Sequence, residues 1–234
     1  MIYLRKGGLC REQKHIMNIL AFADLHGNTA AIHQVLQQEM KPDLVLLLGD
    51  ITNFGKREAV EKVISVIDQY NVQTLGVHGN CDYDNVLEYM RERNMSLHSR
   101  CMIWNGIAFM GVGYSLPCPG KTPGEIDDER FSRFLASAAG ELSAGFPSIL
   151  VTHEPPFDTN ADLAYTKRHV GSLAIREFIE EHQPLACFCG HIHEATGLDY
   201  IGSTLILNPG PLRRGGYIWA SIKDGSIEAD IRSL

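Results

Sequence analysis

Short apolar runs that each stop at a polar residue recur along the chain. The clearest is residues 44–48, Leu-Val-Leu-Leu-Leu, which Gly49 and Asp50 follow. A continuous apolar run of this length, ending in turn residues, is typical of a strand buried on both faces of an α/β sheet. Ligands of open α/β sheets bind beyond the carboxyl ends of the strands. The pattern therefore predicts that Asp50 lies at the rim of a binding crevice.

Four further runs end in the same way. The predicted strands are residues 19–23, 74–78, 148–152 and 186–189. The polar residues that follow them are Asp, Asn or His, namely Asp24, His26, Asn80, Asp82, His153, His191 and His193. Because the carboxyl ends of parallel strands meet at one edge of a sheet, these side chains are expected to gather around Asp50.

Segments with helical periodicity separate the first strands. Helices are predicted over residues 28–39, 57–70 and 85–93. Asn28 or Thr29 is expected to cap the first helix, and contact of Asn28 with a phosphate oxygen is the less favoured alternative. The alternation of strands and helices predicts parallel strands in this half of the chain.

The second half has a different pattern. Asn105-Gly106 predicts a hairpin between strands at residues 101–104 and 107–112. An irregular segment rich in Pro and Gly, residues 114–124, is followed by predicted helices at residues 125–143 and 172–181. Further strands are predicted at residues 197–200, 204–208, 216–223 and 226–231. This order favours two sheets packed face to face, with helices outside.

The domain organisation follows from the same pattern. Residues 1–16 lack sustained periodicity and are interpreted as an N-terminal extension, with Met17 as an alternative start of translation. A short edge strand at residues 2–4 is the other interpretation. Residues 17–234 show no linker and are predicted to form a single domain.

Composition excludes some classes of protein. The 234 residues are 44% hydrophobic and 21% charged, as in ordinary globular proteins, and no apolar run approaches the roughly 18 residues of a membrane span. No signal peptide is visible, and the six cysteines lack zinc-site or CxxC spacing, so a cytoplasmic protein with reduced thiols is expected. The net charge of −7 argues against a general nucleic-acid surface, although it leaves short oligonucleotides open.

The residue types at the strand ends indicate a metal site. Asp24 and His26 are two positions apart, so both side chains can point the same way and chelate one ion; His191 and His193 repeat this spacing. Asp50 lies between the pairs and could bridge two ions. The remaining candidate ligands are the oxygen of Asn80 and a nitrogen of His153. Each residue alone would be read as a turn or capping residue, but five strand ends that agree in type favour metal binding.

The ordered pattern Asp24-x-His26, Gly49-Asp50, Gly79-Asn80-x-Asp82, His153 and Gly190-His191-x-His193 resembles the calcineurin-like metallophosphoesterase superfamily. The resemblance implies a four-layer αββα sandwich, in which two mixed β-sheets are flanked by helices. It also implies a dinuclear centre at the carboxyl ends of the strands. One metal would be bound by Asp24, His26, Asp50 and His193, and the other by Asp50, Asn80, His153 and His191.

The resemblance also implies a reaction, the hydrolysis of a phosphate ester by a metal-bridging hydroxide. Asp50, Asn80, Cys81 and His153 are the catalytic candidates. Cys81 departs from the family pattern, which has His after Gly-Asn and uses it to protonate the leaving group. The Gly-Asn-Cys-Asp form resembles a small prokaryotic phosphodiesterase branch. Without the histidine, Asp82 is expected to serve only as a helix cap.

A phosphodiesterase with two divalent metals is therefore the favoured function, with Mn ahead of Fe, Ni, Zn or Co. A small phosphate ester is the expected substrate, cyclic nucleotides included, and membrane partners are not expected. A broad-specificity phosphomonoesterase or nuclease and a non-catalytic scaffold of the same fold are the alternatives, and a homo-oligomer stays open. Three further features carry weaker signals. His169 could cover the pocket or belong to a solvated basic loop. Residues 208–211 are interpreted as a rigid turn after a strand. Arg213 and Arg214 could meet an anionic substrate or be surface charge.

Overall fold

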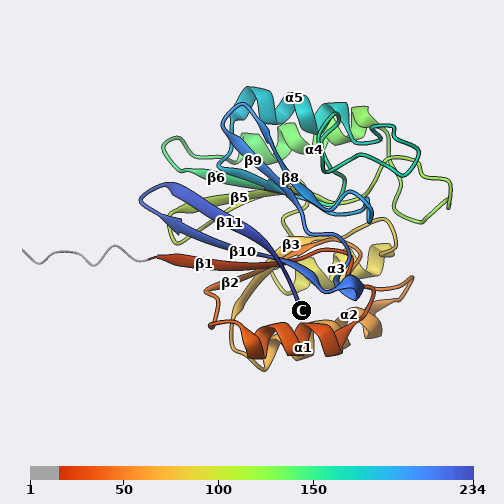
Figure 1. Ribbon diagram of the computed structural model, residues 1–234, viewed down its shortest axis with the longest axis vertical. Coiled ribbons are helices and arrows are strands. Elements are labelled where there is room, and N and C mark those ends of the chain that lie inside the picture. The colour runs from red at the N-terminus through yellow and green to blue at the C-terminus, as the bar shows by residue number, and fades with distance from the viewer. Residues whose placement is uncertain (1–15) are drawn as a thin grey trace, which may run out of the picture.

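The computed structural model describes residues 16–234, which fold into four layers (Figure 1). One five-stranded sheet has the order β11-β10-β1-β2-β3. Its strands are β1 (Met17–Phe22), β2 (Leu44–Leu48), β3 (Gln73–Val77), β10 (Gly216–Lys223) and β11 (Ser226–Ser233). A six-stranded sheet has the order β4-β5-β6-β7-β9-β8. Its strands are β4 (Arg100–Trp104), β5 (Ile107–Val112), β6 (Ser148–Thr152), β7 (Ala186–Phe188), β8 (Gly197–Ile201) and β9 (Thr204–Asn208).

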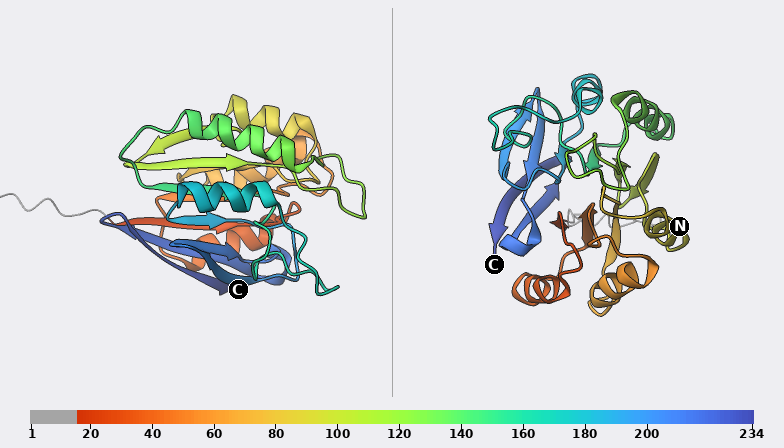
Figure 2. Two further views of the ribbon diagram at one scale, coloured as in Figure 1. Left: turned by 90° about the horizontal axis from the view of Figure 1, so that it is seen from above. Right: turned by 90° about the vertical axis from the view of Figure 1, so that its right-hand side faces the viewer.

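The helices form the two outer layers, and the sheets face one another between them (Figures 1 and 2). The five-stranded sheet is covered by α1 (Thr29–Gln38), α2 (Arg57–Asp68) and α3 (Asp84–Glu92). The six-stranded sheet is covered by α4 (Asp128–Gly140) and α5 (Leu173–His182). A short 3-10 helix, η1 (Leu212–Arg214), precedes β10. The four-layer architecture expected from the sequence is confirmed.

The pairing of the strands also agrees with the sequence pattern. β1, β2 and β3 are parallel, whereas β10 runs antiparallel to β1 and to β11. In the other sheet β5, β6, β7 and β9 are parallel, and β4 and β8 are antiparallel edge strands. Both sheets are therefore mixed. The parallel strands of both sheets deliver their carboxyl ends to one side of the molecule.

Strand β2 is apolar at every position because both of its faces are buried. Its alternate residues Leu44, Leu46 and Leu48 pack into the core between the two sheets. Val45 and Leu47 point the other way and pack against the helices. Full burial of a side chain of this kind contributes about 1.5–3 kcal/mol. The strand is therefore anchored on both faces, and its end, where Asp50 lies, is held firmly.

One helix boundary differs from the expectation. The α4 helix begins at Asp128 rather than at residue 125, because Asp127 caps it by accepting the backbone N–H of Arg130 at 2.9 Å. Residues 1–15, most of the predicted extension, lie outside the described residues.

All five described cysteines are free thiols, whereas the cytoplasmic location inferred from the thiols stays a prediction. Among the described helices, none is both long and apolar enough to cross a membrane.

Candidate active site

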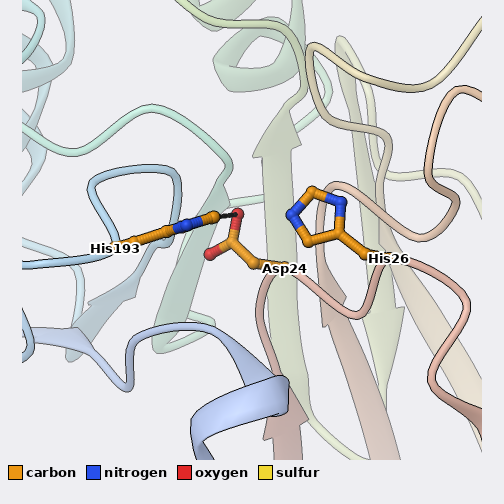
Figure 3. Close-up of side chains that lie close together, drawn as sticks. All are labelled: Asp24, His26 and His193. Carbon is orange, nitrogen blue, oxygen red and sulfur yellow. Dashed lines mark ion pairs between the residues drawn. The ribbon is translucent and has the colours of Figure 1, made fainter.

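The side chains that follow the parallel strands converge, as Figure 3 shows for three of them. His193 Nε2 lies 3.2 Å from Asp24 Oδ1, and the rings of His26 and His193 are 5.5 Å apart. The three residues place ligand atoms within 4.8 Å of one another. Burial opposes ionisation of Asp24, but the contacts with His193 and His153 outweigh it and lower the pKa of the carboxyl. The same contact raises the pKa of His193.

Asp50 lies at the centre of the cluster. Its Oδ2 is 3.8 Å from His26 Nε2, and its Oδ1 is 3.4 Å from His153 Nε2. The residue belongs to two groups of convergent ligand atoms, one with His26 and Cys81 and one with Asp24 and His153. Asp50 is therefore the predicted ligand that faces both halves of the site.

The backbone at the site is held in an uncommon conformation. Asp24, His26, Asp50 and His191 have φ angles of 50°, 44°, 46° and 66°, in the left-handed region. Residues other than glycine rarely adopt this backbone conformation, and those that do cluster at functional sites.

Two glycines allow the strand ends to approach closely. A Cβ atom on Gly49, which has φ +91°, would overlap the ring of His153. A Cβ atom on Gly79 would overlap the carboxylate of Asp50. From the sequence, Gly49 was interpreted as a turn residue and Gly79 as part of the family motif. The structure shows that they also make room for the neighbouring polar side chain.

Asn80 and His153 face one another in a way that suits a cation. His153 Nδ1 lies 2.9 Å from the carbonyl oxygen of Leu48, so Nδ1 is the nitrogen that donates, and Nε2 is the nitrogen that offers a lone pair when the ring acts as a ligand. Asn80 Oδ1 lies 2.8 Å from this Nε2. Two lone pairs that face each other attract a positive charge.

The burial of the cluster supports the same conclusion. Asp24, Asp50 and His153 are at most 2% exposed, and His26 Nδ1 is buried without a hydrogen-bond partner among residues 16–234. Buried carboxylates are costly unless they are paired or coordinate metals. The donor set of carboxylate, amide and imidazole groups therefore fits divalent metal ions.

His191 is placed differently from the other predicted ligands. Its ring is 5.0 Å from that of His153, and its Nε2 lies 3.8 Å from Glu154 Oε2. Within the part of the chain that the structure describes, it belongs to none of the convergent groups of ligand atoms. Burial and the neighbouring His153 lower the pKa of His191 to about 4, so the ring is neutral, as a ligand must be. Its role as a ligand stays a prediction.

Glu154 was not identified from the sequence. It is buried, and it accepts the backbone N–H of Leu116 at 2.9 Å. Burial raises the pKa of its carboxyl to about 8. Its only sequence signal is its position directly after His153.

Asp82 has a larger role than the expected helix cap, and that expectation was wrong. Tyr83, not Asp82, is the N-cap of α3. The Asp82 carboxylate accepts the backbone N–H groups of Ile51, Thr52 and Gly79 at 2.8–3.0 Å, and also the Thr52 hydroxyl. It thus joins the loop that follows β2 to the loop that follows β3, which positions Asp50 relative to Asn80.

The loop of His191 and His193 is held from the other side. Asn208, at the end of β9, donates from Nδ2 to the backbone oxygens of Ala161, Gly190 and Ile192 at 3.0–3.3 Å. Arg214 donates to the backbone oxygen of His193 at 2.8 Å. Both residues therefore act on the shape of the loop, a role that the sequence interpretation of a rigid turn and surface charge did not include.

The remaining candidates have structural roles. Asn28 caps α1 through Oδ1, which accepts the N–H of Ala31 at 3.2 Å, so the favoured interpretation is confirmed. His169 lies 2.6 Å from the buried carboxylate of Asp162, a contact that raises its pKa. Arg213 has only an electrostatic effect: the contact with Asp24 raises the pKa of His193, and the positive charge of Arg213 partly opposes this rise.

Comparison with known proteins now places the fold. A family model described as calcineurin-like phosphoesterase matches residues 17–195. An uncharacterized protein of Methanocaldococcus jannaschii, MJ1162, is 35% identical over 200 residues, which cover 83% of this chain and 88% of that protein. A Mycobacterium tuberculosis protein named cAMP/cGMP dual specificity phosphodiesterase MT0825 is 27% identical over 181 residues. The match covers 73% of this chain and 55% of that protein.

Solved structures share the architecture. The crystal structure of TT1561 of Thermus thermophilus superposes with a TM-score of 0.69 and 18% identity. The superposition covers 92% of this chain and 99% of that one. At this identity the likeness shows the fold alone.

Proposed function

The chain belongs to the calcineurin-like phosphoesterase family, and we propose that it is a phosphodiesterase that uses two divalent metal ions, with manganese as the first candidate. Hydrolysis of phosphate esters is the activity of the family. The choice of a diester and the number of metals are our proposal. A small phosphate ester, with cyclic nucleotides among the candidates, is the proposed substrate.

One observation carries the proposal. Side chains from the ends of β1, β2, β3 and β6 direct oxygen and nitrogen lone pairs at one another inside a buried cluster. We assign one metal to Asp24, His26, Asp50 and His193, and the other to Asp50, Asn80, His153 and His191. Bound divalent ions of this kind acidify water and neutralise charge that develops on a phosphoryl group.

The residues of the chain supply the geometry for this chemistry. The backbone N–H of Cys81 donates to Asp50 Oδ1 at 2.8 Å and fixes the carboxylate that both metals would share. The Leu48 carbonyl fixes the tautomer of His153, so Nε2 stays free to bind. Asp82 holds the loops that carry Asp50 and Asn80 in register.

The preference for a diester with a good leaving group rests on Cys81. This residue stands where the family usually has the histidine that protonates the leaving oxygen. The thiol is only 7% exposed. Burial and the charge of Asp50 raise its pKa. A thiol of high pKa is a poor proton donor, so alkyl monoesters are expected to react slowly. The name of the mycobacterial relative is consistent with a diesterase.

A paired assay tests the proposal. The purified protein, supplied with Mn²⁺, should hydrolyse bis-p-nitrophenyl phosphate faster than p-nitrophenyl phosphate, and a chelator should stop both reactions. Faster hydrolysis of the monoester would contradict the diesterase assignment. Full activity with a chelator present would contradict the metal assignment.

A further inference from the structure

The irregular segment before α4 contacts one of the candidate metal ligands. We propose that Glu125 and Thr122 position the side-chain amide of Asn80, so that its oxygen rather than its nitrogen faces His153. The inference rests on the proposed function, because it concerns the metal that Asn80 and His153 would share. Thr122 and Glu125 would be positioning residues, since neither touches the candidate metal position itself.

The contacts form a chain of three side chains. Asn80 Nδ2 donates to the hydroxyl of Thr122 at 2.9 Å. The Thr122 hydroxyl lies 2.9 Å from Glu125 Oε1, and the backbone N–H of Thr122 donates to the same oxygen at 2.6 Å. The thiol of Cys118 also donates to Glu125 Oε1, at 3.1 Å. Glu125 is therefore surrounded by donors.

The direction of each hydrogen bond follows from the groups involved. An ionised carboxylate can only accept, so the hydroxyl of Thr122 must donate its one hydrogen to Glu125. The Thr122 oxygen is then left as an acceptor toward Asn80, and the amide must present its N–H. The other end of the amide, Oδ1, must consequently face His153. The chain of hydrogen bonds therefore determines which of the two positions the amide oxygen of Asn80 occupies and which the nitrogen occupies.

The segment is itself fixed to the site. The backbone N–H of Gly124 donates to the backbone oxygen of Asn80 at 2.9 Å. A Cβ atom on Gly124 would lie 2.9 Å from Asn80 Cα, so only glycine allows this approach. Ser115 donates its N–H to the Gly124 oxygen and accepts the N–H of Ile126. The two ends of the segment are thus paired, and Thr122 is held next to the amide.

The consequence concerns the affinity for metal. An amide nitrogen has no lone pair for a cation, so an Asn80 side chain that turned over would present N–H groups where a ligand is needed. Partners that hydrogen-bond to ligands typically change metal affinity 10–100-fold when they are removed. Thr122 and Glu125 should therefore matter for one metal and not for the other.

Calorimetric titration of the metal-free protein with Mn²⁺ tests the inference. Thr122→Val removes the hydroxyl and keeps the shape, and it should weaken one of two Mn²⁺ equivalents at least tenfold while the other is unchanged. Thr122→Ser restores the hydroxyl and should bind both equivalents within about threefold of the wild type. Glu125→Ala should weaken the same equivalent as Thr122→Val.

A matched control separates positioning from folding. Thr204 is buried in β9, and its hydroxyl has no hydrogen-bond partner among the described residues, so Thr204→Val should bind both equivalents as the wild type does. Unchanged binding by Thr122→Val, or equal loss in Thr122→Ser, would overturn the inference. A wild type that binds no Mn²⁺ would instead refute the proposed function, so the two failures are distinguishable.

Discussion

The backbone N–H of Cys81 donates to Asp50 Oδ1 across 2.8 Å, so the residue that departs from the family pattern holds the central carboxylate with its main chain. The Cys81 side chain lies next to the same carboxylate, and its Sγ belongs to a group with His26 and Asp50. Because the bond uses only the backbone, the thiol can be replaced without releasing Asp50. The role of the side chain can therefore be tested separately.

Replacement of Cys81 by serine is expected to change little with an activated substrate. A nitrophenolate leaves with little need of a proton, so hydrolysis of bis-p-nitrophenyl phosphate by Cys81→Ser should stay within about threefold of the wild type. Loss of diesterase activity with both metals still bound would show that the thiol takes part in the chemistry.

Replacement of Cys81 by histidine should favour poor leaving groups. A positioned imidazole can contribute roughly 10²–10⁴-fold by general acid catalysis. The ratio of monoesterase to diesterase turnover should rise in Cys81→His, and the rise should be greatest for alkyl phosphates. A ratio that falls for alkyl phosphates, in a variant that folds and binds metal, would contradict this expectation.

Asp82→Asn should destabilise the protein. Both carboxylate oxygens accept backbone N–H groups, so either orientation of the new amide directs its NH₂ at a donor. The expected loss is about 3 kcal/mol in the free energy of unfolding, measured with urea. Asp127→Asn is the matched control, because asparagine caps a helix as well as aspartate does, and it should cost less than about 0.5 kcal/mol. Equal losses of unfolding free energy in the two variants would contradict the role assigned to Asp82.

His98 should make stability depend on pH. Burial, together with the charges of Arg91 and Arg130, lowers its pKa to about 4 from 6.5, and the rings of His78, Tyr114 and Phe134 surround it. Between these values the unfolded chain binds the proton and the folded chain does not. The contribution of neutral His98 is therefore complete above pH 6.5 and is lost as the pH falls toward 4.

A substitution isolates this effect. In His98→Asn the amide oxygen can still accept the N–H of Gly113, which His98 Nδ1 accepts at 3.2 Å. Between pH 7.5 and pH 5 the wild type should lose about 2 kcal/mol more unfolding free energy than this variant. The comparison requires a chelator, so that metal release does not contribute. Parallel pH profiles for the two proteins would show that His98 is not held neutral.

The pattern along the chain predicted the fold and the position of the cluster well, for physical reasons. The apolar run of β2 has to be buried on both faces, so it specifies a central strand and a polar residue at its end. Asp50 could be identified because it follows such a run after a single glycine. The hairpin at Asn105-Gly106 could be predicted for a similar reason, since the two turn residues themselves favour it and no distant contact is needed.

Residues that act across long distances in the sequence were not predictable in this way. Asp82 bonds to Thr52, 30 positions away, and Asn80 to Thr122, 42 positions away. These bonds depend on the course of loops, which no periodicity encodes. Asn208 was likewise interpreted only as a turn residue. Its bonding role could not be seen in the sequence, because the backbone oxygens that it contacts come from two other loops.

Asp50→Asn should abolish activity and leave the fold intact. Asp50 approaches both His26 and His153, so removal of its charge weakens the attraction for both metals at once. Turnover should fall at least 10³-fold by rough estimate, while the circular dichroism spectrum is unchanged. A folded variant with near wild-type turnover would exclude the assigned role of Asp50.

The number of metal ions that each chain binds decides whether the site is dinuclear. The metal-free wild-type protein should be titrated with Mn²⁺ in a calorimeter, while hydrolysis of bis-p-nitrophenyl phosphate is followed at each metal ratio. Two Mn²⁺ ions should bind per chain, and activity should reach its plateau only when the second has bound. Full activity with one ion or with none would contradict the two-metal assignment.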